Sequence, residues 1–158
     1  MNKLIVIEHI KFALEAKLNE AQQAAQSAHE DATHEQSVAE TQYDSLSIES
    51  GYLAQGQSER VNEVHKSISL FAQSYDVNVL PKIGLGSLIK AIDIDDNTHW
   101  FYLGPSEGGL KVVVKGELIL VITPSSPIGK AMNGKRVGDE CEYTVAGQTY
   151  NYEILAAM

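Results

Sequence analysis

Five carboxylates lie within sixteen residues of the first half of the chain, in the stretch 29–44 with the sequence HEDATHEQSVAETQYD. They are Glu30, Asp31, Glu35, Glu40 and Asp44. Such a concentration of negative charge suits a bound cation or a basic surface on a partner. The stretch separates two long polar segments that favour helix, so it is predicted to form the acidic tip of a helical hairpin.

Two histidines add possible metal ligands to this stretch, beside its carboxylates. His29 and His34 are five residues apart and do not share one helix face well, and the H-E-x-x-H spacing of zinc helices is absent. A structural zinc site is therefore disfavoured. Asp93, Asp95 and Asp96 lack the glycine and distant glutamate of a calcium-binding EF-hand, so they are interpreted as the end of a strand and its turn.

The chain is acidic, with 12 Lys and Arg against 21 Asp and Glu and a formal charge of −9. This charge disfavours direct, sequence-specific DNA binding, because phosphates would repel the protein. Cys141 is the one cysteine, so no disulfide within the chain is possible. The sequence shows neither a signal peptide nor a membrane-spanning apolar run, which predicts a soluble, cytoplasmic protein.

Helix breakers divide the chain into two parts. All four prolines lie between residues 81 and 127 and ten of the twelve glycines between 84 and 147, whereas the first fifty residues contain neither. Proline costs about 3 kcal/mol inside a helix and glycine about 1 kcal/mol. Long helices are therefore expected first, followed by strands and turns, with a junction near residues 74–81.

The helical part is predicted to be an antiparallel coiled-coil hairpin over residues 1–75, with its tip near 34–44. Its first helix carries apolar residues at coiled-coil spacing, and the second helix is expected from about Ser45 to Phe71. The predicted seam of the first helix is Leu4, Ile7, Leu14, Leu18, Ala21, Ala25, Ala28 and Ala32, with Lys11 in one position. Because the seam shrinks to alanine, the helices should approach closely near the tip, and Gly51 and Gly56 of the second helix would suit that packing.

The second part, residues 80–158, is predicted to be a small α+β domain with an antiparallel sheet and one short helix. Strands are expected at 87–94, 98–103, 111–114, 117–122, 140–145 and 148–155. The short helix lies within 123–134, with Ser125 or Ser126 as N-cap, Pro127 at its first position and Gly134 at its end. Cys141 is predicted to be buried. Trp100, Phe101 and Tyr102 are consecutive, so at least one should face outwards, where it could contact a partner, although a position in the core is favoured for them.

The run SPIGKAMNGKRVGD at residues 126–139 resembles the signature of the Gre-type (GreA/GreB) bacterial transcript cleavage factors. Tyr43 and the pair Gly51-Tyr52 resemble positions that follow the hairpin tip in that family. The family has an N-terminal coiled-coil hairpin and a C-terminal domain of FKBP-like fold, and the resemblance covers nearly the whole chain.

The resemblance implies an accessory factor of bacterial RNA polymerase, with neither enzymatic activity nor a cofactor of its own. Gre factors insert the hairpin through the secondary channel, where acidic tip residues help to hold a second Mg²⁺ ion while the polymerase cleaves backtracked RNA. By resemblance, Ser126, Pro127 and Ile128 would contact the channel rim. Glu35, Glu40 and Asp44 would be the metal-assisting residues of the tip.

The tip departs from the family pattern. Alignment on Tyr43 places Gln36 and Ala39 where the family has an Asp and a Glu, and Glu35 and Glu40 are each shifted by one residue. A non-cleaving regulator that binds the secondary channel and competes with cleavage factors is therefore the alternative. A prolyl isomerase, suggested by the FKBP-like fold, is disfavoured because this half is short and shows no clear aromatic-lined pocket.

Overall fold

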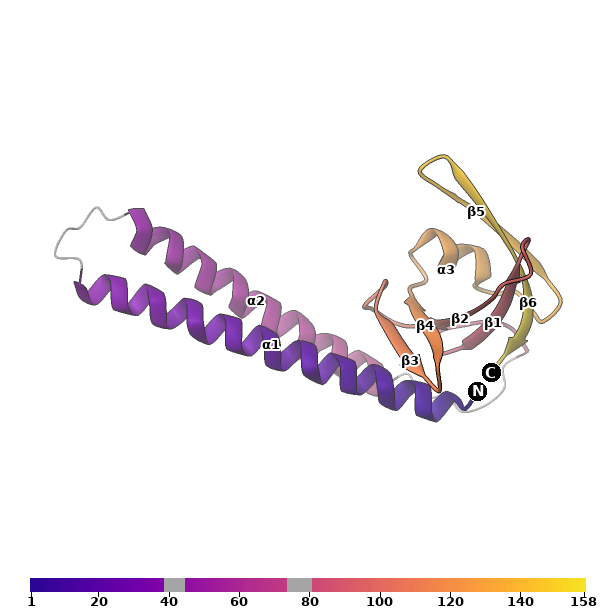
Figure 1. Cartoon of the computed structure of the whole chain (residues 1–158), viewed down its shortest axis with the longest axis horizontal. Helices are drawn as coiled ribbons and strands as arrows, with labels where there is room; N and C mark the ends of the chain where they lie inside the picture. The colour runs from indigo at the N-terminus through magenta and orange to yellow at the C-terminus, as the bar shows by residue number, and fades with distance from the viewer. Residues whose placement is uncertain (39–44, 74–80) are drawn as a thin grey trace. The chain divides into compact units, whose positions relative to one another are not determined.

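The computed structural model describes residues 1–38, 45–73 and 81–158 (Figure 1). The elements are α1 (Lys3–Val38), α2 (Ser45–Gln73), β1 (Leu88–Asp93), β2 (Thr98–Leu103), β3 (Lys111–Val114), β4 (Glu117–Ile122), α3 (Pro127–Met132), β5 (Glu140–Val145) and β6 (Gln148–Ala157). The predicted class is confirmed: two long helices precede a sheet domain with one short helix. Neither long helix, over its described residues, is apolar enough to cross a membrane.

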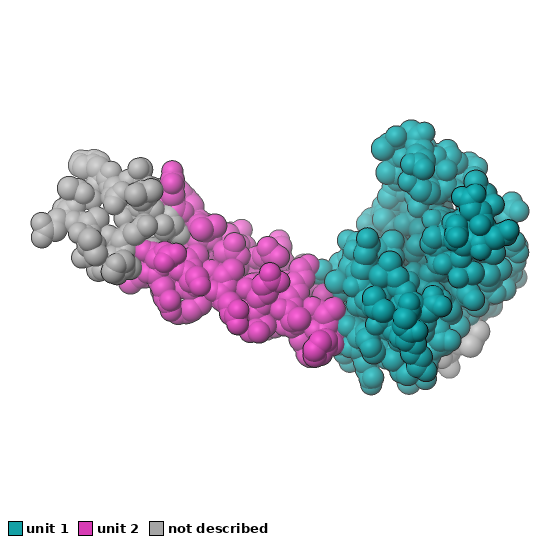
Figure 2. Space-filling view, viewed as in Figure 1, with its two compact units in different colours: residues 1–11, 69–158 teal, residues 12–68 magenta. Residues whose placement is uncertain are grey.

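Packing divides the chain into two compact units (Figure 2). The helical unit consists of residues 12–68, and the sheet unit combines residues 1–11 with residues 69–158. The start of α1, up to Lys11, and the end of α2, from Ser69, therefore belong to the sheet unit. The junction expected near residues 74–81 includes the segment 74–80, which lies outside the described residues.

The helical unit contains a seam of the predicted heptad spacing. Leu14, Ala21 and Ala28 follow one another at intervals of seven residues and are all buried, as is Val64 of α2. An open groove of about 580 Å³ is lined by residues between 22 and 29 of α1 and between 54 and 62 of α2, so these two segments lie side by side (Figure 1). The seam therefore narrows from leucine to alanine along α1, as the sequence predicts.

The seam prediction is wrong at the start of α1. Leu4 is 49% exposed, whereas Val6, Ile7 and Ile10 are buried. This segment belongs to the sheet unit. Its buried face is consequently set by the sheet domain and not by the heptad pattern of the hairpin.

The close-packing interpretation of Gly51 and Gly56 is also wrong. Both residues are exposed in α2, and a Cβ atom added at either one would meet no other atom within 4 Å. These glycines make no close helix contact, and their effect is to lower the helix propensity of α2.

Replacement of Gly56 by alanine is therefore expected to stabilise the helical unit by about 0.5–1 kcal/mol, because it restricts the unfolded backbone without a steric cost. Urea unfolding followed by circular dichroism at 222 nm would measure the change. The reverse substitution in the same helix, Ala54→Gly, should destabilise it by a similar amount. A loss of stability in G56A would contradict the open environment of Gly56.

The six strands form one sheet in the order β3-β4-β2-β1-β6-β5. β2 and β4 pair in parallel, and the other neighbours are antiparallel. This parallel pair differs from the purely antiparallel sheet expected. It arises because residues 104–110 run along the outer part of β4, where Gly104 and Gly109 donate backbone hydrogen bonds to the carbonyls of Ile122 and Val121, before β3 turns back.

One face of the sheet packs against α3. Its core is apolar and includes Cys141, whose predicted burial is confirmed. The members are Ile83, Ile89, Ala91, Phe101, Leu103, Ile122, Ile128, Met132, Cys141 and Ile154. On the opposite face Phe71 of α2 stacks on Tyr102, with ring centroids 6.1 Å apart.

The expectation that one of three consecutive aromatic residues faces outwards is wrong. Trp100, Phe101 and Tyr102 alternate between the two faces of β2, as successive residues of a strand must. All three are buried, because packed side chains cover both faces of the sheet at this central strand.

Candidate partner-binding site

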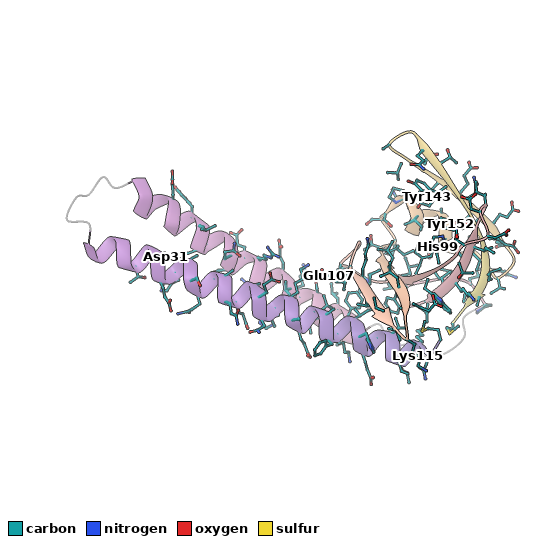
Figure 3. All side chains as sticks on the ribbon, in the orientation of Figure 1. Asp31, His99, Glu107, Lys115, Tyr143 and Tyr152 are labelled. Atoms are coloured by element: carbon teal, nitrogen blue, oxygen red, sulfur yellow. The ribbon has the colours of Figure 1, made fainter. Side chains whose placement is uncertain are left out.

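The acidic stretch 29–44 covers the last turns of α1 and the connection to α2. Glu30 and Asp31 are exposed on α1, and Glu30 Oε1 accepts a 2.7 Å hydrogen bond from Gln26 Nε2. Figure 3 labels Asp31 on this helix. Glu35 is described only as helical backbone, and Glu40 and Asp44 lie outside the described residues. The structure therefore describes the part of the stretch that belongs to α1, and the roles of Glu35, Glu40 and Asp44 remain predictions.

The helix α1 continues to Val38, beyond the first shifted position of the tip. Glu35 and Gln36 are thus successive positions of a helix, which are rotated by about 100° from each other around its axis. The one-residue shift between Glu35 and Gln36 thus falls within the helical backbone of α1 and not in a loop.

The helix α3 begins as the sequence predicts. Ser126 is the N-cap, and its Oγ accepts a 3.1 Å hydrogen bond from the backbone N–H of Gly129. The same hydroxyl donates to the carbonyl of Thr123 at 2.7 Å. Pro127 occupies the first helical position and is exposed. Gly134, with φ at 82°, follows the helix.

The three predicted contact residues differ in what they present to a partner. Ser126 is half-buried with its hydroxyl engaged in the cap, and Ile128 is 8% exposed within the core. Pro127 is exposed, and Lys130, three residues further along the helix, is exposed as well. Pro127 and Lys130 share a helix face by their spacing. Lys130 is a candidate contact that the sequence analysis did not single out, although its position three residues after Pro127 could have indicated it.

Gly129 is required by the fold of this segment. A Cβ atom added there would lie 1.8 Å from the carbonyl oxygen of Thr123, which is far inside van der Waals contact. The chain between Thr123 and Gly129 is therefore a tight turn closed on itself by the Ser126 hydroxyl. This turn holds Pro127 at the surface and Ile128 in the core.

An aromatic cluster, which the sequence analysis missed, lies on the α3 face of the sheet (Figure 3). Tyr143 stacks on Tyr150 with ring centroids 5.0 Å apart, and Tyr152 meets Phe101 and His99 edge to face at 5.5 and 5.3 Å. The alternation of Tyr143, Tyr150 and Tyr152 across the predicted final hairpin was the available signal. These rings pack on one another, and burial raises the pKa of both Tyr143 and Tyr152.

Asp93 links this cluster to the β1–β2 turn. Its Oδ1 accepts hydrogen bonds from the backbone N–H groups of Asp95 and Asn97, both at 2.9 Å. Its Oδ2 lies 2.7 Å from Nε2 of His99. The hydrogen bond with His99, followed by those with Asn97, lowers the pKa of the Asp93 carboxyl to about 2. Among the described residues, no cluster of three His, Cys, Asp or Glu side chains could hold a metal ion.

Comparison with known proteins assigns the sheet unit. Residues 81–158 match the family described as "Transcription elongation factor, GreA/GreB, C-term". The chain is similar to Transcription elongation factor GreA of Thermodesulfovibrio yellowstonii, with 32% identity over 77 residues that cover 48% of this chain and 44% of the relative. It is 35% identical over 100 residues to the GreA of Bartonella tribocorum, covering 61% of this chain and 59% of the relative. The chain thus spans about half the length of these curated relatives.

Two solved structures are similar in outline. The crystal structure of GreA factor homolog 1 (Gfh1) of Thermus thermophilus shares 18% identity, covers 94% of both chains and gives a TM-score of 0.39. The GreA/GreB factor of Nitrosomonas europaea shares 20% identity over 60% of this chain and 78% of that one, with a TM-score of 0.36. The assignment to a family rests on the sequence match.

The Asp93 carboxyl predicts a specific dependence of stability on pH. Because its pKa is lower in the folded chain than in the unfolded one, its contribution is complete above pH about 4 and is lost as the pH falls through about 2. In Asp93→Asn the amide oxygen can still accept the turn hydrogen bonds, so the urea midpoint should fall less steeply between pH about 4 and about 2 than in the wild type. Equal slopes for the two proteins would exclude this role.

The substitution Gly129→Ala is expected to destabilise the sheet unit by roughly 2–4 kcal/mol, because the turn from Thr123 must open to admit the methyl group. Thermal unfolding followed by the near-ultraviolet signal of the aromatic residues would detect the change. Lys130→Ala, at the next and exposed position of α3, serves as the control and should change stability by less than about 0.5 kcal/mol.

Proposed function

We propose that the chain belongs to the GreA/GreB family of transcription elongation factors, whose C-terminal model matches residues 81–158, and that it binds bacterial RNA polymerase as an accessory factor without enzymatic activity of its own. In this proposal the helical hairpin enters the secondary channel of the polymerase, and the sheet unit docks on the channel rim. The family match over the sheet unit is the observation that carries the proposal. The protein would act in the cytoplasm, where the polymerase is found.

The dimensions and charge of the helical part support insertion. The 36 residues of α1 correspond to about 54 Å of helix, at a rise of about 1.5 Å per residue. The first 75 residues contain five basic and eleven acidic residues, a net charge of −6. A pair of long, acidic helices of this kind is suited to a narrow channel that leads to bound cations.

The finer proposal is that the tip stimulates cleavage of backtracked RNA by the polymerase. Glu35, Glu40 and Asp44 would add carboxylate oxygens around a second Mg²⁺ ion in the polymerase active site, and the polymerase would perform the hydrolysis. The protein would supply ligands to an ion that the polymerase already uses. It would need no metal or other cofactor of its own.

The alternative is a regulator that occupies the channel without supporting cleavage. Gln36 and Ala39 stand at the two positions where the family has its acids, and α1 remains helical past Gln36. Successive positions of a helix are about 100° apart around its axis, so a carboxylate moved by one position would not take the place of the family's acid. This observation favours a protein that docks, obstructs the channel and competes with cleavage factors.

Docking on the rim is proposed for the surface at the start of α3. Pro127 and Lys130 are its exposed residues, while Ser126 and Ile128 maintain the turn and the core beneath it. The variant Pro127→Ala with Lys130→Ala removes this surface without the steric change that Gly129→Ala imposes. It should weaken polymerase binding while leaving the fold intact.

A backtracked elongation complex with end-labelled RNA tests the proposal. If the tip is active, the protein should shorten the RNA, and Glu35→Gln with Glu40→Gln should abolish shortening because neutral amides hold Mg²⁺ far more weakly than carboxylates. The double variant should still bind the polymerase. Glu59→Gln with Glu63→Gln, two exposed positions of α2, changes the charge equally and should retain cleavage.

Other outcomes separate the proposals. RNA that stays intact, together with protection from an added GreA protein, would exclude cleavage and support the competing regulator. Absence of polymerase binding by the wild-type chain would contradict both.

A further inference from the structure

The sheet face opposite α3 has an open part that the proposed function does not use. Ala91 and Ile154 face α3 in the core, so their neighbours Ile92 and Glu153 point to the opposite face. Ile92 and Glu153 are in register, and Glu153 is also in register with Glu140. A hollow of about 490 Å³ lies here, lined by Ile92, Asp93, Ile94, Asp96, Glu140, Asn151, Tyr152, Glu153 and Leu155.

Aliphatic side chains in this hollow are exposed to an unusual degree. Ile94 is 80% exposed and Leu155 is 38% exposed. Leu155 is the extra residue of a bulge, because Lys90 is in register with Ala156 and Ala91 with Ile154. A bulge redirects the side chain that it leaves unpaired. Exposed aliphatic residues that line one hollow are characteristic of a surface that a partner covers.

Carboxylates surround these aliphatic residues. Glu140 and Glu153 are exposed and directly opposite each other across β5 and β6, and like charges in that relation destabilise a sheet. Asp96 adds a third exposed carboxylate at the β1–β2 turn. Among the described residues that line the hollow none is Lys or Arg. Lys90 lies on the same face, but its Nζ lies over the Trp100 ring at 5.6 Å.

We propose that this hollow binds a basic segment of a partner protein in which Lys or Arg residues alternate with aliphatic residues. The aliphatic side chains would cover Ile94 and Leu155, and the cations would lie between Glu140, Glu153 and Asp96. Cations placed there relieve the repulsion between Glu140 and Glu153. Binding is therefore favoured both by the covering of the aliphatic side chains and by the pairing of charges. A nucleic acid is disfavoured because its phosphates would face these carboxylates.

Titration of the ¹⁵N-labelled full chain with two short peptides, observed by NMR, tests this proposal without polymerase. One peptide alternates lysine with valine and the other alternates glutamate with valine. The lysine peptide should shift the amide signals of Ile92, Ile94, Glu153 and Leu155 in a saturable and salt-sensitive manner, and the glutamate peptide should not. No saturable shift up to about 1 mM, or shifts centred elsewhere, would overturn the proposal.

Matched variants locate the site. Glu140→Gln with Glu153→Gln should weaken lysine-peptide binding by about tenfold, whereas Glu8→Gln with Glu117→Gln, also exposed, should leave it unchanged. Ile94→Ser should weaken binding, and Val113→Ser, at a 59% exposed position of β3, should not. Equal weakening by the control variants would show that only net charge or general apolarity matters, and would overturn the proposal. The amide spectrum of each variant reports whether it remains folded.

Discussion

The burial of β2 on both faces is the constraint on which the sheet unit depends. Phe101 and Leu103 contribute to the core beneath α3, while Trp100 and Tyr102 face the other way, where Phe71 stacks on Tyr102. A strand that is apolar on both sides requires a packed layer on each side. The end of α2, from Ser69 onwards, belongs to the sheet unit and supplies part of this second layer.

The elements of the fold were largely predictable from local patterns. Helix breakers are absent from the first fifty residues, and Leu14, Ala21 and Ala28 repeat at seven-residue intervals, so both the helix and its buried stripe follow from the sequence. The wrong predictions concern which segments pack or pair with one another, and not which residues form helices and strands. Leu4 fits the heptad but is exposed, because the sheet unit sets the buried face there. The parallel pairing of β2 and β4 depends on the path of residues 104–110, which no local pattern specifies.

The candidate site was predictable where a residue's role is local. Ser126 as N-cap and Pro127 at the first position follow from the rules for beginning a helix. The roles of Gly129 and Asp93 were not predictable in the same way, since they depend on the carbonyl of Thr123 and the ring of His99, which folding brings to them. The exposed Ile94 and the bulge at Leu155 likewise require the register between β1 and β6. Sequence patterns thus indicate where elements begin, and the pairing of strands decides which side chains meet.

The Thr123 carbonyl lies so close to Gly129 that it leaves no space for a side chain there. This affects what a match to the family signature implies about activity. The motif at residues 126–139 contains a hydroxyl that closes a turn, a glycine for which no other residue has space, and an isoleucine in the core. Selection for folding alone would retain these residues. Chains that have diverged in activity can therefore keep this signature intact, since the motif is required for folding.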